Sequence, residues 1–234
     1  MDRFSRTEML LGKSGMEILS QSTVGIFGIG GVGSFAAEAL ARSGVGHLVL
    51  IDPDDICLTN INRQIHAATS TVGRKKTAVM KERILDINPD ALVDTLEEFY
   101  LPEKAEKFFS RPYDYIVDAI DTVTGKISLV LQCKARQIPL ISCMGAGNKL
   151  DPTRFEVADI YETKVDPLAR VLRKKLREHG VQSLKVVYSQ EIPLTPEGKA
   201  QEDGGKKPPG SISFVPSVAG LLLAGEVIKD LLQK

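Results

Sequence analysis

The chain has few cysteines, and none of them form a closely spaced pair. Cys57, Cys133 and Cys143 are the three cysteines among its 234 residues, and the motif C-x-x-C does not occur. Structural zinc sites of the paired-cysteine kind and disulfide frameworks both depend on such spacings. The sequence therefore argues against a structural zinc site and against a fold stapled by disulfides.

The chain also has no net charge and no long apolar run. Its 30 basic residues balance its 30 acidic residues, so the total charge demands no polyanionic partner, although a local basic patch remains open. The first ten residues show no long apolar core and no cleavage signature, and Pro216 and Glu226 interrupt the most apolar stretch, 212–228. We therefore expect a cytoplasmic protein with no membrane span, in which 212–228 forms a buried helix.

Residues 24–52 combine, in order, a strand, a glycine turn, a helix, a second strand and an acid. An apolar run at 24–27 leads into the motif G-x-G-x-x-G at 28–33, alanine-rich helical sequence follows, and an apolar run at 47–51 ends in Asp52. This order is typical of a nucleotide-binding βαβ unit. Close packing of a helix on a strand also produces glycine turns, but it does not explain the terminal acid. The sequence therefore predicts a nucleotide site, and NAD, FAD and ATP all fit it.

Each position of this unit has a physical role in such a site. Gly28 permits the tight turn, Gly30 and Gly31 let backbone N–H groups approach a phosphate, and Gly33 lets the helix pack on the strand. The helix N-terminus then faces the anion with its partial positive charge. Asp52, at the tip of the second strand, is placed to accept hydrogen bonds from ribose hydroxyls.

Strand and helix patterns alternate along the first two thirds of the chain. Alternation of this kind predicts an α/β fold with a doubly wound, mostly parallel sheet, Rossmann-like, and an antiparallel extension in the C-terminal part. We expect an ATP-binding core at 1–147 and an extension of the same domain at 148–234, with a mobile loop at about 195–210. Beyond residue 52, we expect strands at 91–96, 113–119, 139–143, 155–161 and 184–188, and helices at 73–87, 102–109, 123–136 and 166–178, with one or two short helices at 7–20.

Charged and amide side chains follow the glycine turn at three places. Asn60, Arg63 and Gln64 lie in a connection too long for an ordinary βα loop, and such connections are usually functional. Lys76 lies in the first turn of the helix expected at 73–87, and Asp121 follows the fourth strand. Singly, these residues are also explained as an ion-pair partner, a solvated lysine and a helix N-cap. Together at one sheet edge they favour a triphosphate site, in which Asp121 can reach the phosphates or their Mg²⁺.

Several short motifs along residues 3–150 resemble one family. They are RFSR from Arg3 to Arg6, GIGGVGS, ID-x-D with Asp52 and Asp54, N-x-N-RQ from Asn60, TVG-x-x-K ending at Lys76, and D-x-x-D ending at Asp121. These motifs resemble the adenylating enzymes related to ubiquitin activators, which include activators of sulfur-carrier proteins. The resemblance implies that ATP and Mg²⁺ bind here and that a carboxylate attacks the α-phosphate.

The resemblance also implies roles for individual residues. The glycine turn and the aspartates would hold ATP, while Arg63, Lys76 and Asp121 would surround the triphosphate and Mg²⁺. Arg6 would reach into the site of a neighbouring subunit, which implies a homodimer with shared sites. Two features depart from the sulfur-carrier activators: the C-x-x-C pairs are absent, and no cysteine follows Cys143.

The second half of the chain resembles a subgroup of this family. The segments beginning SCMGAGNKL, LKVVYSQE and PGSISFVPS are similar to the dehydratases that cyclise threonylcarbamoyladenosine in tRNA beside the anticodon. The substrate already carries a carboxylate, so internal attack on an adenylate needs no enzyme thiol. Alternatives are an activator of a ubiquitin-like or sulfur-carrier protein, with a sulfur-transfer partner protein, an NAD-dependent oxidoreductase, and a nucleotide-sensing scaffold.

A concentration of positive charge on the helix expected at 166–178 offers a surface for tRNA. Its apolar residues Leu168, Val171, Leu172 and Leu176 should form the packed face. A charge run alone is more often a solvated surface, but the resemblance to a tRNA-modifying enzyme favours a docking role. The basic residues predicted to contact tRNA are Arg170, Arg173, Lys174 and Arg177.

Overall fold

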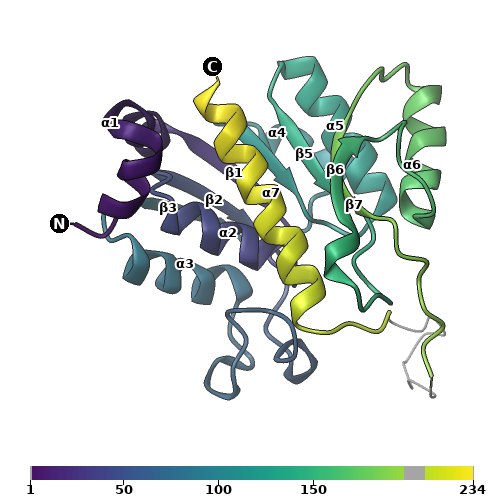
Figure 1. Cartoon of the computed structure of the whole chain (residues 1–234), viewed down its shortest axis with the longest axis horizontal. Coiled ribbons are helices and arrows are strands. Elements are labelled where there is room, and N and C mark those ends of the chain that lie inside the picture. The colour runs from purple at the N-terminus through teal and green to yellow at the C-terminus, as the bar shows by residue number, and fades with distance from the viewer. Residues whose placement is uncertain (1, 198–208, 234) are drawn as a thin grey trace.

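The computed structural model describes residues 2–197 and 209–233, arranged as a sheet with helices on both faces (Figure 1). The loop expected at about 195–210 lies mostly outside the described residues. Seven strands follow the order β3-β2-β1-β4-β5-β7-β6, and every neighbouring pair is parallel except β6 and β7. The predicted fold class, with its antiparallel extension, is therefore confirmed. The strands are β1 (Thr23–Phe27), β2 (His47–Ile51), β3 (Leu92–Leu96), β4 (Tyr115–Asp118), β5 (Leu140–Cys143), β6 (Phe155–Asp159) and β7 (Lys185–Ser189).

Helices of two groups cover the two faces of the sheet. One face packs against α1, α2, α3 and α7, and the other against α4 and α5, with α6 beside α5. The last helix runs diagonally across the front of Figure 1 from the sheet edge near α2. The helices are α1 (Ser5–Gln21), α2 (Gly33–Arg42), α3 (Lys76–Ile87), α4 (Ala105–Phe108), α5 (Val123–Arg136), α6 (Pro167–Glu178) and α7 (Phe214–Leu232).

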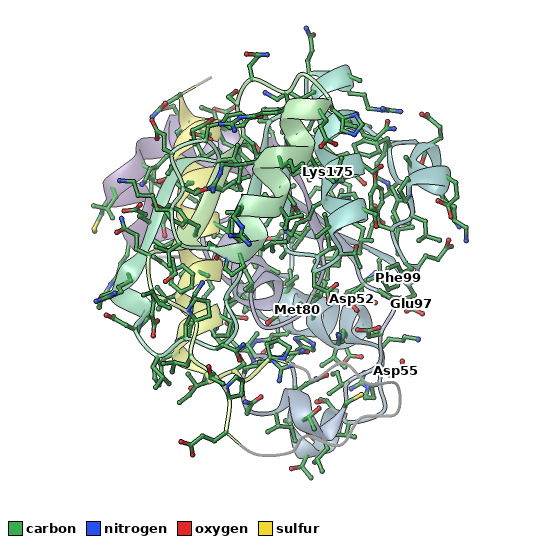
Figure 2. All side chains as sticks on the ribbon, turned by 90° about the vertical axis from the view of Figure 1, so that its right-hand side faces the viewer. Asp52, Asp55, Met80, Glu97, Phe99 and Lys175 are labelled. Atoms are coloured by element: carbon green, nitrogen blue, oxygen red, sulfur yellow. The ribbon has the colours of Figure 1, made fainter. Side chains whose placement is uncertain are left out.

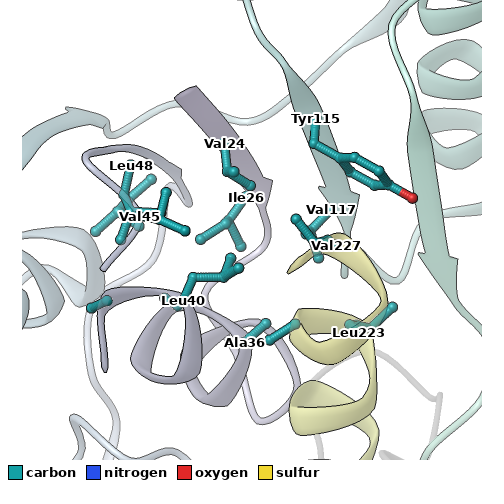
Figure 3. Packing of buried hydrophobic residues seen from close by; sticks show 14 of the residues in the cluster. Val24, Ile26, Ala36, Leu40, Val45, Leu48, Tyr115, Val117, Leu223 and Val227 are labelled. Carbon is teal, nitrogen blue, oxygen red and sulfur yellow. The ribbon is translucent and has the colours of Figure 1, made fainter. Parts of the chain in front are cut away.

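Strand residues alternate between the two faces, as a sheet covered on both sides requires. Val24 and Ile26 of β1 join the cluster under α2 and α7, whereas Phe27 joins the aromatic cluster under α4 and α5. Figure 3 shows the first cluster, in which Leu223 and Val227 of α7 approach the strands beside α2. The 212–228 stretch is thus a buried helix, as its sequence predicts, and no helix in the described residues has the length and apolarity to cross a membrane.

The structure corrects the expected bounds of several elements. Helix α3 begins at Lys76 rather than Gly73, because Gly73 has a φ of 84° and ends a turn. The expected helix at 102–109 is a 3-10 turn followed by the four residues of α4. Helix α1 is continuous in hydrogen bonding but kinked at Gly12, where φ is 72°, so the expectation of one or two short helices is met by two joined segments.

The position of β4 beside β1 makes a crevice at the carboxyl ends of the strands. The chain leaves β1 toward β2 on one side, and it later crosses from β3 to β4 on the other side. Loops that leave neighbouring strands in opposite directions open a space at the sheet edge, and ligands of doubly wound sheets bind there.

Candidate active site

A pocket of about 410 Å³ lies at this crevice and collects residues from every predicted motif except the N-terminal one. Its walls come from the glycine turn after β1, the loop after β2, the long connection before α3, and the loop after β4. Residues 98–100, 146–147 and the start of α7 complete it. In Figure 2, Asp52 and Phe99 lie close together at this lower side of the molecule, well below Lys175 of α6.

The glycine turn is built by two close backbone approaches. Gly28 has a φ of 90°, and a Cβ atom there would lie 2.7 Å from the carbonyl oxygen of Ala119 in the loop after β4. A Cβ atom on Gly33 would lie 1.8 Å from the carbonyl oxygen of Gly28. Only glycine fits at both positions, since no other residue combines positive φ with the missing side chain. Gly30 and Gly31, by contrast, face the pocket.

Asp52 joins three of the predicted motifs. Its carboxylate accepts hydrogen bonds from the backbone N–H of Ile29 at 2.7 Å and of Asp54 at 3.0 Å, and it lies 3.5 Å from Nζ of Lys76. Burial raises the pKa of the Asp52 carboxyl, and the Lys76 ammonium opposes that rise. The carboxylate therefore fixes the glycine turn relative to α3 in addition to its predicted contact with ribose.

Lys76 is the first residue of α3, and its ammonium group is held at the pocket wall. Nζ donates to Oδ2 of Asp54 at 2.6 Å, and only 8% of the Lys76 side chain is exposed, whereas 59% of the Asp54 side chain is exposed. Helix α3 has no side-chain N-cap, so the partial positive charge of its first turn reinforces the ammonium group. The arrangement concentrates positive charge where a phosphate would lie.

The long connection is itself ordered by short local hydrogen bonds. Oδ1 of Asn60 accepts the N–H of Cys57 at 3.0 Å, which closes a 3-10 turn. Nη1 of Arg63 donates to the carbonyl oxygen of Thr59 at 2.8 Å, which leaves other guanidinium N–H groups for a ligand. Gln64 is buried beside Gly30. Asn60, Arg63 and Gln64 all line the pocket, as their motif predicts.

Asp121 lines the pocket from the opposite wall. Its carboxylate is exposed and has no hydrogen-bond or ion-pair partner among residues 2–197 and 209–233. The described residues contain no cluster of three His, Cys, Asp or Glu side chains that could hold a metal alone. A single carboxylate facing a phosphate site suits Mg²⁺, which usually binds through one or two carboxylates plus substrate phosphates.

Sequence reasoning missed a buried ion pair beneath the pocket floor. Nζ of Lys126, whose side chain is 1% exposed, lies 3.0 Å from both carboxylate oxygens of Asp118 and donates to the carbonyl oxygen of Cys143 at 2.8 Å. Ser142 donates to the same carboxylate at 2.5 Å. This network ties the ends of β4 and β5 to α5 and so fixes the loop that carries Asp121. A lysine within an otherwise apolar helix face was the available signal.

A second group missed by sequence reasoning is a set of buried polar atoms without partners. His66 is 3% exposed, and neither ring nitrogen has a hydrogen-bond partner among the described residues. Burial, with contributions from Lys76 and Arg83, lowers the pKa of His66 to about 4, so the ring stays neutral at pH 7. The other atoms of this kind belong to Ser34, Gln64 and Thr77, in or beside the segments that carry the glycine turn, Arg63 and Lys76.

Two predicted features lie away from the pocket or are inert. Arg6 is exposed on α1 and does not line the pocket, since α1 packs at the amino-terminal edge of the sheet, where the carbonyl oxygen of Leu19 accepts the N–H of Gly46. Its role in a second subunit's site stays a prediction. Burial raises the pKa of Cys143 to about 12, so its thiol remains protonated and the residue behaves as a small core side chain.

The basic helix α6 keeps only part of its predicted arrangement. Leu172 and Leu176 are buried, but Val171 is 43% exposed, because Ala169 occupies the packed face instead. The guanidinium of Arg173 donates to the carbonyl oxygen of Thr163 at 2.7 Å. Arg170 and Lys174, one turn apart, are exposed and have no such partner in the part of the chain that the structure describes, and Arg177 lies over the ring of Tyr161.

Comparison with known proteins gives matches over the whole chain. The sequence model of the ThiF family matches residues 4–234. A relative from Bacillus subtilis named tRNA threonylcarbamoyladenosine dehydratase is 51% identical over 243 residues, covering 100% of this chain and 96% of the relative. A relative of the same name from Escherichia coli is 37% identical over 252 residues, covering 99% and 94%. A crystal structure of E. coli TcdA in complex with ATP matches with a TM-score of 0.90 at 37% identity, covering 99% of this chain and 94% of that one.

Proposed function

The chain belongs to the ThiF family, and from this membership we propose that it is an ATP-dependent tRNA threonylcarbamoyladenosine dehydratase. The observation that carries the proposal is the convergence of the glycine turn, Asp52, Lys76, Arg63 and Asp121 on one pocket. Relatives named for this activity, and a TcdA structure bound to ATP, support both the nucleotide and the substrate.

The pocket residues suit transfer of a nucleotide to a carboxylate. The carboxylate of the threonylcarbamoyl group attacks the α-phosphorus of ATP, the bond to the β-phosphate oxygen breaks, and pyrophosphate leaves. Arg63 and Lys76 supply positive charge where negative charge develops, while the N–H groups near Gly30 and Gly31 bind phosphate oxygens. Asp121 would hold Mg²⁺, which neutralises charge on the phosphates when bound.

The second step is an internal ring closure. An atom of the same modification attacks the activated carbonyl carbon, loses its proton and expels AMP, so the two steps together remove one water. Intramolecular attack has a high effective molarity, and the protonated state of the Cys143 thiol agrees with a route that uses no enzyme thiol.

We place the tRNA contact on the exposed face of α6. Arg170 and Lys174 carry charges that the chain leaves unpaired, whereas Arg173 is held by Thr163 and Arg177 stacks on Tyr161. Residues 148–234 would then extend the 1–147 core with an RNA surface within the same domain. The remaining parts of the proposal are a cytoplasmic location and a homodimer in which Arg6 reaches the partner's pocket.

The decisive experiment measures nucleoside products after incubation with ATP and tRNA carrying the modification. Wild-type protein should yield the cyclised nucleoside and AMP, while tRNA lacking the threonylcarbamoyl group should yield neither. Lys76→Met should reduce the rate by ~10²–10³, because one charged contact in a preorganised site contributes about 2.7–4 kcal/mol. Lys81→Met, on the same helix but outside the pocket lining, is the matched control. Product formation by Lys76→Met at a rate close to wild type would contradict the assignment.

The RNA surface is tested by charge reversal. Arg170→Glu combined with Lys174→Glu should weaken tRNA binding and reduce the log–log salt slope by roughly 1.4–1.8, since each lost phosphate contact removes about 0.7–0.9. Lys13→Glu with Lys104→Glu makes the same change in net charge on other exposed surfaces and should leave both quantities nearly unchanged. Equal effects of the two double variants would exclude α6 as the docking surface.

A further inference from the structure

A second buried ion pair links the pocket wall directly to the start of α6. The Lys149 ammonium lies 3.1 Å from Oδ2 of Asp166, and the two side chains are 1% and 0% exposed. Neither residue belongs to the pocket lining or to the basic face of α6. Burying an isolated pair of charges is costly, so a pair retained between two functional surfaces calls for an explanation beyond stability.

Each partner of the pair is bonded to one of the two surfaces. Nζ of Lys149 donates to the carbonyl oxygen of Gly145 at 2.5 Å, and the next two residues, Ala146 and Gly147, line the nucleotide pocket. Oδ1 of Asp166 accepts the N–H of Ala169 at 2.9 Å, which makes Asp166 the N-cap of α6. The carboxylate therefore holds the helix with one oxygen and the pocket-wall lysine with the other.

The backbone around both partners is tightly constrained. Val165 has a φ of 66°, and the N–H of Asp166 donates to the carbonyl oxygen of Lys164 at 2.6 Å, which is the hydrogen bond of a strained γ-turn. A β-branched residue at positive φ is a genuine outlier, and such strain concentrates at sites that respond to ligands. A Cβ atom on Gly145 would lie only 3.2 Å from the Asp166 carboxylate, so the helix cap and the wall are in contact.

The packing adds a parallel connection. Leu172 and Leu176 of α6 share one hydrophobic cluster with Met144, which directly precedes Gly145. A displacement of α6 along its axis therefore moves the residues on both sides of the carbonyl group that Lys149 holds. Two contacts of different chemistry, apolar and ionic, act on the same short segment.

We propose that Lys149 and Asp166 are positioning residues that couple RNA docking on α6 to the nucleotide pocket wall at residues 146–147. The coupling rests on the proposed function, because it assumes that α6 contacts the tRNA and that the pocket holds ATP. It adds a mechanism by which either substrate changes the affinity for the other, and such coupling is reciprocal.

The test compares the affinity for a non-hydrolysable ATP analogue with and without saturating tRNA that lacks the modification. We expect an at least five-fold change in wild-type Kd, and less than two-fold in the double variant Lys149→Met with Asp166→Asn. This variant removes both buried charges together, while Asn retains the oxygen that caps α6. The exposed pair Arg74 and Glu82, changed to Met and Gln, is the matched control and should keep the wild-type coupling.

Three outcomes would overturn the inference: no coupling in wild type, full coupling in the double variant, or equal loss in the control. If the double variant does not fold, hydrogen exchange on wild-type protein decides, since tRNA alone should slow exchange of backbone amides in 145–150. Unchanged exchange there would also overturn it. Failure of the proposed function would appear separately, as no cyclised nucleoside from wild-type protein with modified tRNA and ATP.

Discussion

Removing the ammonium group of Lys126 should be one of the most damaging single changes outside the pocket. Lys126→Met retains most of the side-chain volume but leaves the Asp118 carboxylate buried with only Ser142 and one backbone N–H as partners. Loss of one partner of a buried pair typically costs about 3–5 kcal/mol, because the other charge remains uncompensated. A domain of this size loses roughly 2–4 °C in Tm per kcal/mol, so Tm should fall by about 6–20 °C.

Calorimetry or thermal circular dichroism measures this change directly. Lys134→Met is the matched control, because Lys134 lies on the same helix α5 and its ammonium group makes one exposed 3.4 Å contact to Ser183. Its Tm should shift by only a degree or two. The double variant Asp118→Asn with Lys126→Met should recover part of the loss, because no uncompensated charge remains. A Tm for Lys126→Met within two degrees of wild type would refute the reasoning.

Three further predictions concern other parts of the molecule. The folded pKa of His66, about 4, lies below its ordinary value of 6.5, so the unfolded chain binds more protons between these pH values, and up to ~3 kcal/mol of stability is lost as pH falls from 6.5 to 4; His66→Gln should flatten this part of a urea-unfolding pH series, and an unchanged slope would contradict it. Gly33→Ala should destabilise the fold by about 3 kcal/mol or more through the 1.8 Å clash, whereas Gly225→Ala in open space on α7 should stabilise it by ~0.4–1 kcal/mol; equal urea midpoints would count against the close approach. Mixing Arg6→Ala and Asp121→Ala chains should restore activity if Arg6 acts in trans, and no recovery despite subunit exchange, followed by native mass spectrometry, would exclude a shared site.

Local patterns predicted the sheet and several element bounds well. The strand at 47–51 and the helix at 123–136 have the predicted ends, because apolar runs there are bounded by Gly46 and Asp52, and by Thr122 and a left-handed Gln137. The convergence of the nucleotide motifs at one sheet edge also followed from strand order alone, since parallel strands end on the same side.

The sequence could not reveal contacts that depend on packing across distant segments. Lys126 pairs with a residue on β4 and one on β5, and Lys149 pairs with the cap of α6, so neither pair has a local spacing that marks it. The apolar stripe of α6 was wrong at Val171 because the small residue Ala169, which hydropathy alone does not favour, faces the core. Arg173 looked like a free cation until its hydrogen bond to Thr163 was seen.

The arrangement of α7 has a consequence for synthesis of the protein. This helix follows every other described element in the chain, yet Val215 and Leu223 lie in the central core, and Pro216 meets Gly31 at the nucleotide pocket. A nascent chain that has already formed β1 and the glycine turn therefore still lacks one wall of its nucleotide site and one cover of its sheet. Nucleotide binding thus becomes complete only after α7 has left the ribosome, which makes ATP affinity a marker of a finished chain.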